Sequence, residues 1–204
     1  MSENFLEIQN GNFTASEKNK VNNVNLIIKD QGEIISLLGP SGIGKTTILR
    51  TIAGLQKLSK GKIILKGKIL SSENVHVEPE ERKVALSFQD NSLFPNYKVI
   101  DNINFGKKRI NGNGSSISAD EIINILHIEA ILNKFPHQIS AGEAQRVSLA
   151  RSLVSKPNLL LLDEPFSNID QSLKEELQLK IKNILNELNI STIIVTHDSY
   201  EAFY

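Results

Sequence analysis

The chain has 204 residues, 40% of them hydrophobic, which is enough for one domain with a sizeable core. Its 23 basic and 23 acidic residues cancel, which argues against a nucleic-acid partner, since such proteins normally carry a basic excess. The absence of cysteine excludes disulfides and thiolate metal sites. The first ten residues show no secretory signal, and no apolar run approaches the roughly 20 residues of a membrane helix. Any membrane role is therefore expected to depend on a separate partner.

Strands and helices alternate along the first part of the chain. Short apolar or alternating segments predict strands at 5–9, 24–28, 33–38 and 84–88. Residues 62–70 favour a hairpin with Gly67 at or near its turn. Apolar residues at helical spacing predict a helix over 46–55, with Gly54 near its end.

The pattern changes after residue 89. Helical periodicities occur at 99–105, 119–132 and 142–154, and the composition of 111–116 indicates a flexible loop. An apolar strand at 159–162, an amphipathic helix at 173–188 and a strand at 192–195 then restore the alternation. We predict a single domain over 1–204, in which 1–89 and 158–204 form an α/β core and 90–157 an inserted helical subdomain.

The segment from Gly39 to Thr46 matches the phosphate-loop motif G-x-x-x-x-G-K-[ST] between a predicted strand and a predicted helix. Its glycines let backbone N–H groups turn toward phosphate oxygens, and the helix N-terminus adds its positive dipole end. Lys45 would place its charge on the outer phosphates, and the Thr46 hydroxyl would ligate Mg²⁺. The expected nucleotide contacts are Gly39, Pro40, Ser41, Gly42, Ile43, Gly44, Lys45, Thr46 and Thr47. The alternative is a glycine-rich turn that binds nothing.

Two carboxylates, Asp163 and Glu164, follow the apolar strand predicted at 159–162. Ligands of open α/β sheets bind at the carboxyl ends of the strands. Asp163 is therefore placed to hold Mg²⁺, directly or through water, and Glu164 to orient and polarise an attacking water. The alternative is a polar strand end that leads into a turn broken by Pro165.

The segment Ser140, Ala141, Gly142 and Glu143 forms a capping box ahead of an apolar helical run. Plain helix capping is the simpler interpretation of this pattern. The other interpretation is an anion site, because a helix N-terminus with small residues attracts negative charge.

Six segments in the same order resemble the ATP-binding cassette (ABC) family: the phosphate loop, Gln89 after Ser87 and Phe88, 139–147, 162–165, 167–170 and 195–198. They extend from residue 39 to 198, and 139–147 is similar to the family's signature motif. The resemblance implies a P-loop NTPase of the ABC-ATPase type. Its RecA-like α/β core would carry an antiparallel β region and an inserted α-helical subdomain, and it would hydrolyse ATP with Mg²⁺ to energise a membrane transporter.

The resemblance also implies roles for single residues. Residues 140–143 would contact the γ-phosphate of ATP held by a second subunit, with Ser140 and Gly142 as the main contacts. Two subunits would thus enclose two ATP molecules head to tail. Gln89 would approach Mg²⁺ and the attacking water, Glu164 would be the catalytic glutamate, and His197 the switch histidine at the γ-phosphate. Asp170 is expected at the dimer interface.

Two positions depart from the family pattern. Ala141 stands in place of the first signature glycine, and its methyl group disfavours positive φ and is expected to crowd the partner's phosphate. The aromatic residue that stacks on adenine has no clear counterpart, and Phe13 is the best candidate.

Two longer stretches, 78–82 and 87–95, look like those of bacterial importers for iron, polyamines, sulfate and sugars, and 163–168 is similar to ferric-iron importers. This resemblance implies an integral-membrane permease, a periplasmic solute-binding protein as indirect partner, and a peripheral place on the cytoplasmic face of the inner membrane. Residues 93–95 and 99–105 would help form the groove for the permease, or are ordinary core. The competing function is a non-transport ABC ATPase, such as a cell-division or repair regulator.

Overall fold

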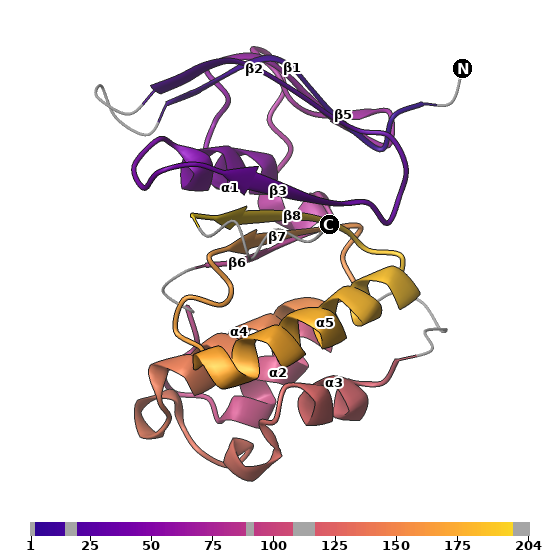
Figure 1. Ribbon diagram of the computed structural model, residues 1–204. Coiled ribbons are helices and arrows are strands. Elements are labelled where there is room, and N and C mark those ends of the chain that lie inside the picture. Colours follow the sequence, from indigo (N-terminus) through magenta and orange to yellow (C-terminus); the bar gives the residue numbers. More distant parts are fainter. Residues whose placement is uncertain (1–2, 15–19, 89–91, 108–116, 198–204) are drawn as a thin grey trace.

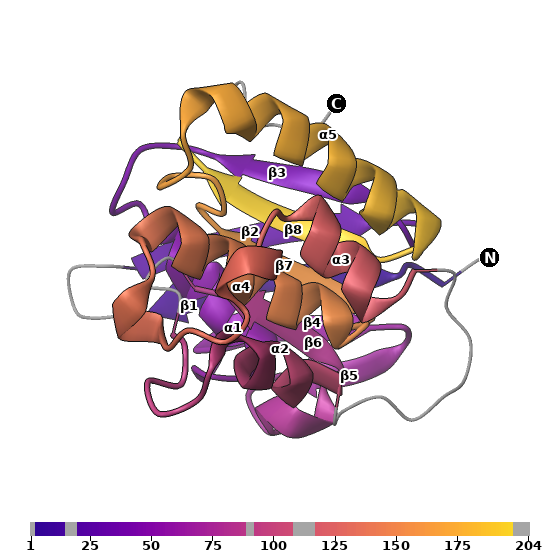
Figure 2. The same cartoon turned by 90° about the horizontal axis from the view of Figure 1, so that it is seen from below.

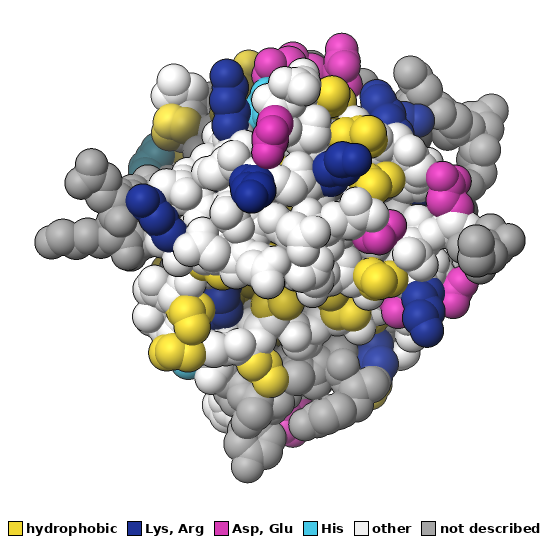
Figure 3. Space-filling model, turned by 90° about the horizontal axis from the view of Figure 1, so that it is seen from above, with side chains coloured by type: hydrophobic (Ala, Val, Ile, Leu, Met, Phe, Trp, Pro, Cys, Tyr) yellow, Lys and Arg dark blue, Asp and Glu magenta, His cyan; other side chains and the backbone are white. Residues whose placement is uncertain are grey.

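Two four-stranded sheets are stacked with helix α1 (Lys45–Ala53) between them in the computed structural model (Figure 1). The structure describes residues 3–14, 20–88, 92–107 and 117–197. The first sheet is antiparallel in the order β2-β1-β4-β5. Its strands are β1 (Leu6–Thr14), β2 (Lys20–Ile28), β4 (Lys60–Leu65) and β5 (Lys68–Ser71). Figure 3 views the molecule from the side of the antiparallel sheet, and acidic, basic and single apolar side chains are interspersed on this face.

The second sheet is parallel, in the order β3-β8-β7-β6. Its strands are β3 (Ile34–Leu38), β6 (Val84–Ser87), β7 (Leu159–Asp163) and β8 (Ser191–Thr196). Leu38 pairs with Thr196 and Asp163 pairs with Val195, so the strands end at one common edge. The segments that follow β3, β7 and β8 therefore start side by side.

Helices cover the other face of the parallel sheet (Figures 1 and 2). They are α2 (Val99–Lys107), α3 (Ala119–Ile125), α4 (Ala141–Val154) and α5 (Gln171–Glu187), with 3₁₀ turns at Glu129–Ile131 and Pro136–Gln138. A further 3₁₀ turn, Pro79–Glu81, precedes β6. Within the described ranges no helix is both long and apolar enough to cross a bilayer.

Strand β7 divides the hydrophobic core into two clusters. All five of its residues are buried, because layers cover the sheet on both faces. Leu159 and Leu161 belong to the cluster around α1, whereas Leu160 and Leu162 belong to the cluster beneath the helices. The alternation of side chains along a strand thus explains why the segment is a continuous run of leucine.

The predicted strands and helices are present, with one exception in the helical region. The single helix expected at 119–132 is wrong, because α3 ends at Ile125. His127 has a φ of 51°, a left-handed conformation that a right-handed helix cannot continue through. The chain then turns so that Ile128 and Ile131 enter the core. The loop expected at 111–116 lies outside the described residues, and the division into core and inserted subdomain stays a prediction.

Candidate functional site

The phosphate loop links the carboxyl end of β3 to the N-terminus of α1. Gly44 is the N-cap of α1 with a φ of 102°, and no side chain caps this helix end. A Cβ at Gly44 would collide with the Val21 side chain, so only glycine fits this position. The first N–H groups of α1 thus lack a side-chain acceptor, which suits a bound anion.

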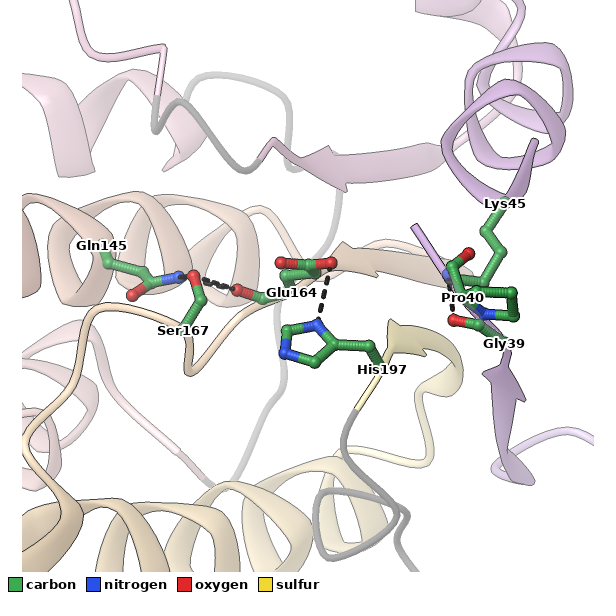
Figure 4. A network of polar contacts seen from close by, with 7 residues as sticks. All are labelled: Gly39, Pro40, Lys45, Gln145, Glu164, Ser167 and His197. Carbon is green, nitrogen blue, oxygen red and sulfur yellow. Dashed lines mark hydrogen bonds and ion pairs between the residues drawn. The ribbon is translucent and has the colours of Figure 1, made fainter. Parts of the chain in front are cut away.

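Lys45 folds back over this loop (Figure 4). Its Nζ donates hydrogen bonds to the carbonyls of Gly39 and Pro40 at 2.5 and 2.9 Å. The residue is only 8% exposed, so its ammonium group depends on these carbonyls for solvation. Acceptor oxygens of a phosphate could replace them at the mouth of the loop.

Asp163 ends β7 and lies against the first turn of α1. Burial raises the pKa of its carboxyl group, and a hydrogen bond from the Thr46 hydroxyl opposes that shift. A carboxylate and a hydroxyl are the oxygen donors that Mg²⁺ accepts, and Mg²⁺ commonly takes one or two carboxylates together with nucleotide phosphates. The pair therefore fits such an ion. Among the residues that the structure describes, no cluster of three or more His, Cys, Asp or Glu forms a protein-only metal site.

Glu164 has a φ of 49°, a conformation that a residue with a side chain rarely adopts. Hydrogen bonds hold it there: its N–H donates to the Val195 carbonyl at 2.9 Å, and its own carbonyl accepts from Gln145 and Ser167 at 2.8 and 3.1 Å. Its Oε1 lies 3.2 Å from Nδ1 of His197 (Figure 4). The Glu164 side chain is 14% exposed and the His197 side chain 57%, so the pair is open to solvent on the histidine side.

The capping box at the start of α4 is confirmed. The Ser140 hydroxyl accepts from the Glu143 N–H at 3.2 Å, and the Glu143 carboxylate accepts from the Ser140 N–H at 2.7 Å. This second hydrogen bond lowers the pKa of Glu143. Ser140 and Ala141 are exposed at the helix end.

Ala141 and Gly142 differ in whether the backbone around them leaves room for a side chain. Ala141 is the first residue of α4 and has no positive φ, so the strain expected from its methyl group is absent. Gly142 is the position that requires glycine, because a Cβ there would lie 2.6 Å from the carbonyl oxygen of Asn168.

The polar residues predicted from 39–47, 163–164 and 197 meet at the carboxyl edge of the parallel sheet. Residues 140–143 begin α4 in the helical layer and are not among the residues that contact Lys45 or Asp163 in the described part of the chain. The edge thus brings together an ammonium group, a hydroxyl, two carboxylates and an imidazole, whereas the N-terminus of α4 carries a capping box with two exposed residues.

Residues 21–167 match the model of the ABC transporter family. The chain belongs to the ABC transporter family. Among its ABC relatives is the Fe(3+) ions import ATP-binding protein FbpC of Escherichia coli (strain K12), which is 38% identical over 202 residues. Another is the spermidine/putrescine import ATP-binding protein PotA of Nitrosospira multiformis, which is 42% identical over 205 residues. The alignments cover 98% and 97% of this chain but only 57% and 54% of these relatives.

The fold is that of solved ABC cassettes. A dimeric post-hydrolysis state of the ATP-binding cassette MJ0796, bound to ADP and Pi, matches with a TM-score of 0.83 and 27% identity. That match covers 97% of this chain and 90% of the cassette. The cassette cbiO1 of Clostridium perfringens, part of the ABC transporter complex cbiONQ, matches with a TM-score of 0.76 and 28% identity. It covers 96% of this chain and 79% of that cassette.

Of two further site predictions for this ABC cassette, the structure places one, Phe13, in the core, and the other, Gln89, stays a prediction. Phe13 is fully buried in the core around α1, and its ring lies under Gly11, where a Cβ would sit 2.7 Å from it. A buried ring has no free face for adenine, so Phe13 is not retained as a stacking residue. Gln89 lies outside the described residues.

Sequence patterns missed two buried polar residues of the cassette. Gln145 is 3% exposed, and its spacing of four from the buried Leu149 places a polar group on an apolar helix face, a signal that could have identified it. Arg82 is 2% exposed and donates to the carbonyls of Thr51 and Ile52 at 3.0 and 2.9 Å.

Arg82 has no comparable signal in the sequence, because the carbonyls of Thr51 and Ile52 that it binds lie at the end of a distant helix. Burial lowers the pKa of Arg82 to about 10, against the opposing charge of Glu78, so the guanidinium stays cationic at neutral pH. A cation complements the negative dipole at a helix C-terminus. Arg82 therefore anchors the end of α1 that is remote from the phosphate loop.

Proposed function

We propose that the chain binds ATP with Mg²⁺ and hydrolyses it as the ATP-binding subunit of an ABC importer. One observation carries the proposal: three groups of residues lie together at the carboxyl edge of the parallel sheet. They are the phosphate loop, the Thr46–Asp163 pair, and Glu164 with His197, whose side chains are 3.2 Å apart. Relatives named as import ATP-binding proteins and a similar cassette bound to ADP and Pi support it.

Binding is assigned to the phosphate loop of residues 39–47. The ammonium group of Lys45 exchanges the carbonyls of Gly39 and Pro40 for oxygens of the outer phosphates. Thr46 and Asp163 hold Mg²⁺, with Gln89 as the third expected ligand. When bound, Mg²⁺ supplies positive charge that stabilises the phosphate oxygens during transfer.

Hydrolysis is assigned to Glu164 and His197. The Glu164 carboxylate accepts a hydrogen bond from the attacking water and takes its proton as the water oxygen bonds to the γ-phosphorus. The bond from the γ-phosphorus to the bridging oxygen breaks in the same step, and ADP leaves with that oxygen. His197 Nδ1 fixes the direction of that carboxylate whenever the proton resides on this nitrogen. His197 is exposed enough to contact a γ-phosphate as well.

A second subunit completes each site. Ser140 and Ala141 are exposed at the N-terminus of α4, where N–H groups and the helix dipole attract a phosphate from outside the chain. The dimeric form of the similar cassette supports a pair of ATPase subunits. We propose that the pair is a homodimer, or a dimer with another ATPase subunit, arranged head to tail. Residues 140–143 of one chain then contact the ATP that is held by the phosphate loop of the other.

An exposed aromatic cluster supports a permease partner. The ring of Phe94 lies 5.7 Å from that of Tyr97 and 4.7 Å from that of Phe105, and Tyr97 and Phe105 are 51% and 39% exposed. Exposed apolar groups of this kind mark binding surfaces. We assign the cluster to an integral-membrane permease, and we propose that the chain acts at the cytoplasmic face of the inner membrane. Ferric iron, delivered by a periplasmic binding protein, is the first cargo to test.

Isolation of the native complex distinguishes an importer from a soluble ABC ATPase. With the chain tagged at its N-terminus and purified from detergent-solubilised membranes, we expect an integral-membrane permease to co-purify in stoichiometric amount. The variant Tyr97→Asp should lose this partner, because a charge in an apolar contact is strongly unfavourable. A soluble cell-division or repair protein as the stoichiometric partner would contradict the importer assignment.

The variant Ala141→Gly is expected to preserve or raise ATPase activity. It removes a methyl group that faces the partner's phosphate, and the loss of helix propensity is at most about 1 kcal/mol. Ala144→Gly, one turn further along α4, is the matched control for the propensity term. Steady-state phosphate release measures both variants, and a large loss confined to Ala141→Gly would show that the segment is not a typical signature.

A further inference from the structure

Gln145 connects helix α4 to the segment that follows strand β7. Its Nε2 donates to the Glu164 carbonyl at 2.8 Å and to the Ser167 hydroxyl at 3.3 Å. Its Oε1 accepts from the Asn168 N–H at 3.0 Å. One buried side chain therefore makes three hydrogen bonds to this segment. Figure 4 shows Gln145 beside Glu164 and Ser167.

A backbone contact one turn earlier in α4 strengthens the same connection. Gly142 approaches the Asn168 carbonyl so closely that a Cβ would stand 2.6 Å from it. The Asn168 residue is thus held through its N–H by Gln145 and packed at its carbonyl against Gly142. The N-terminal part of α4 and residues 164–168 form one mechanical unit, because neither can shift without breaking these contacts.

The hydrogen bond from Gln145 to the Glu164 carbonyl links helix α4 to the backbone of the proposed catalytic residue. The φ of 49° at Glu164 is unfavourable for a glutamate and persists only when neighbouring groups hold it. Gln145 supplies the shorter of the two side-chain hydrogen bonds that the Glu164 carbonyl accepts. Loss of this donor weakens the restraint on the conformation that aims the carboxylate toward His197.

We infer that Gln145 is a positioning residue that couples the two ATP sites of the dimer. This inference rests on the proposed function. Residues 140–143 contact the partner's ATP, whereas Glu164 acts on the ATP of its own chain. A displacement of α4 when the partner's ATP binds reaches Glu164 through Gln145, so occupancy of one site aligns the catalytic group of the other. Coupling of this kind appears as cooperativity between the sites.

The variant Gln145→Met tests the inference, because it keeps the length of the side chain and removes all three hydrogen bonds. ATP affinity should stay within about twofold of the parent, since the phosphate loop is untouched, while kcat falls about tenfold or more. The parent should hydrolyse ATP with a Hill coefficient above one, and the variant with a coefficient near one. The control Gln178→Met makes the same change on α5, where Nε2 is buried and has no hydrogen-bond partner among the described residues.

Ser167→Ala is a second variant that perturbs the structure less, and it tests the inference if Gln145→Met folds poorly. It deletes an exposed hydroxyl that contacts both Gln145 and the Glu164 carbonyl, and it should lower kcat and the Hill coefficient by a smaller amount. If neither variant differs from Gln178→Met while the parent hydrolyses ATP, Gln145 is only a satisfied core residue and the inference is wrong. A parental Hill coefficient of one also overturns it. A parent that does not hydrolyse ATP overturns the proposed function as well.

Discussion

The variant Glu164→Gln is expected to lose ATP turnover by about 100-fold or more, the usual range for removal of a general base. The amide keeps the shape of the side chain but cannot take a proton from the attacking water. ATP affinity should stay within about twofold of the parent, because Lys45 and the phosphate loop are unchanged. The ATP-bound dimer should therefore accumulate. Phosphate release, nucleotide binding and sedimentation in the presence of ATP measure these three outcomes.

Glu176→Gln is the matched control for this substitution. Glu176 lies on α5 and pairs with Lys180 and His127 at the surface, away from the carboxyl edge of the sheet. The exchange of one exposed carboxylate for an amide there should leave turnover at the parental rate. Parental turnover in Glu164→Gln itself would contradict the role assigned to Glu164.

The variant Lys45→Ala should weaken Mg²⁺-ATP binding by about 10- to 100-fold, since hydrogen bonds to charged groups contribute about 1.5–3 kcal/mol each. The buried ammonium group is the cation nearest the loop carbonyls, and alanine offers no replacement for it. Calorimetric titration with a slowly hydrolysed ATP analogue and Mg²⁺ gives the affinity directly.

Lys62→Ala serves as the control for the charge change, because Lys62 is exposed on β4 in the antiparallel sheet. It should bind the analogue as the parent does. An unchanged affinity in Lys45→Ala would refute the phosphate role of Lys45 and with it the assignment of the loop.

The sequence predicted the elements of the fold well because layers on both faces constrain the strands. Leu159 to Leu162 must be apolar at every position, since alternate side chains enter different core clusters. The break after Ile125 was not predictable from periodicity, because Ile128 and Ile131 continue an apolar pattern while the backbone turns. Tertiary packing, and not local helix propensity, therefore determines where α3 ends.

The residues of the candidate site likewise differ in whether the sequence could predict their positions. The phosphate loop and Glu164 follow strands directly and Asp163 ends one, so their place at the sheet edge follows from the chain order. Phe13 was misplaced because sequence spacing carries no information about which sheet face is covered. Arg82 was missed because its function depends on the end of a helix some 30 residues away, as its contacts with Thr51 and Ile52 show.

The most direct test of the composite site is the specific ATPase activity of the purified chain as a function of its concentration. Sedimentation on the same samples fixes the fractions of monomer and dimer. We expect the monomer to bind ATP yet hydrolyse it poorly, and the activity per chain to rise in parallel with the dimer fraction. Parental activity in samples that contain only monomer would contradict the proposal that residues 140–143 of a second subunit complete the site.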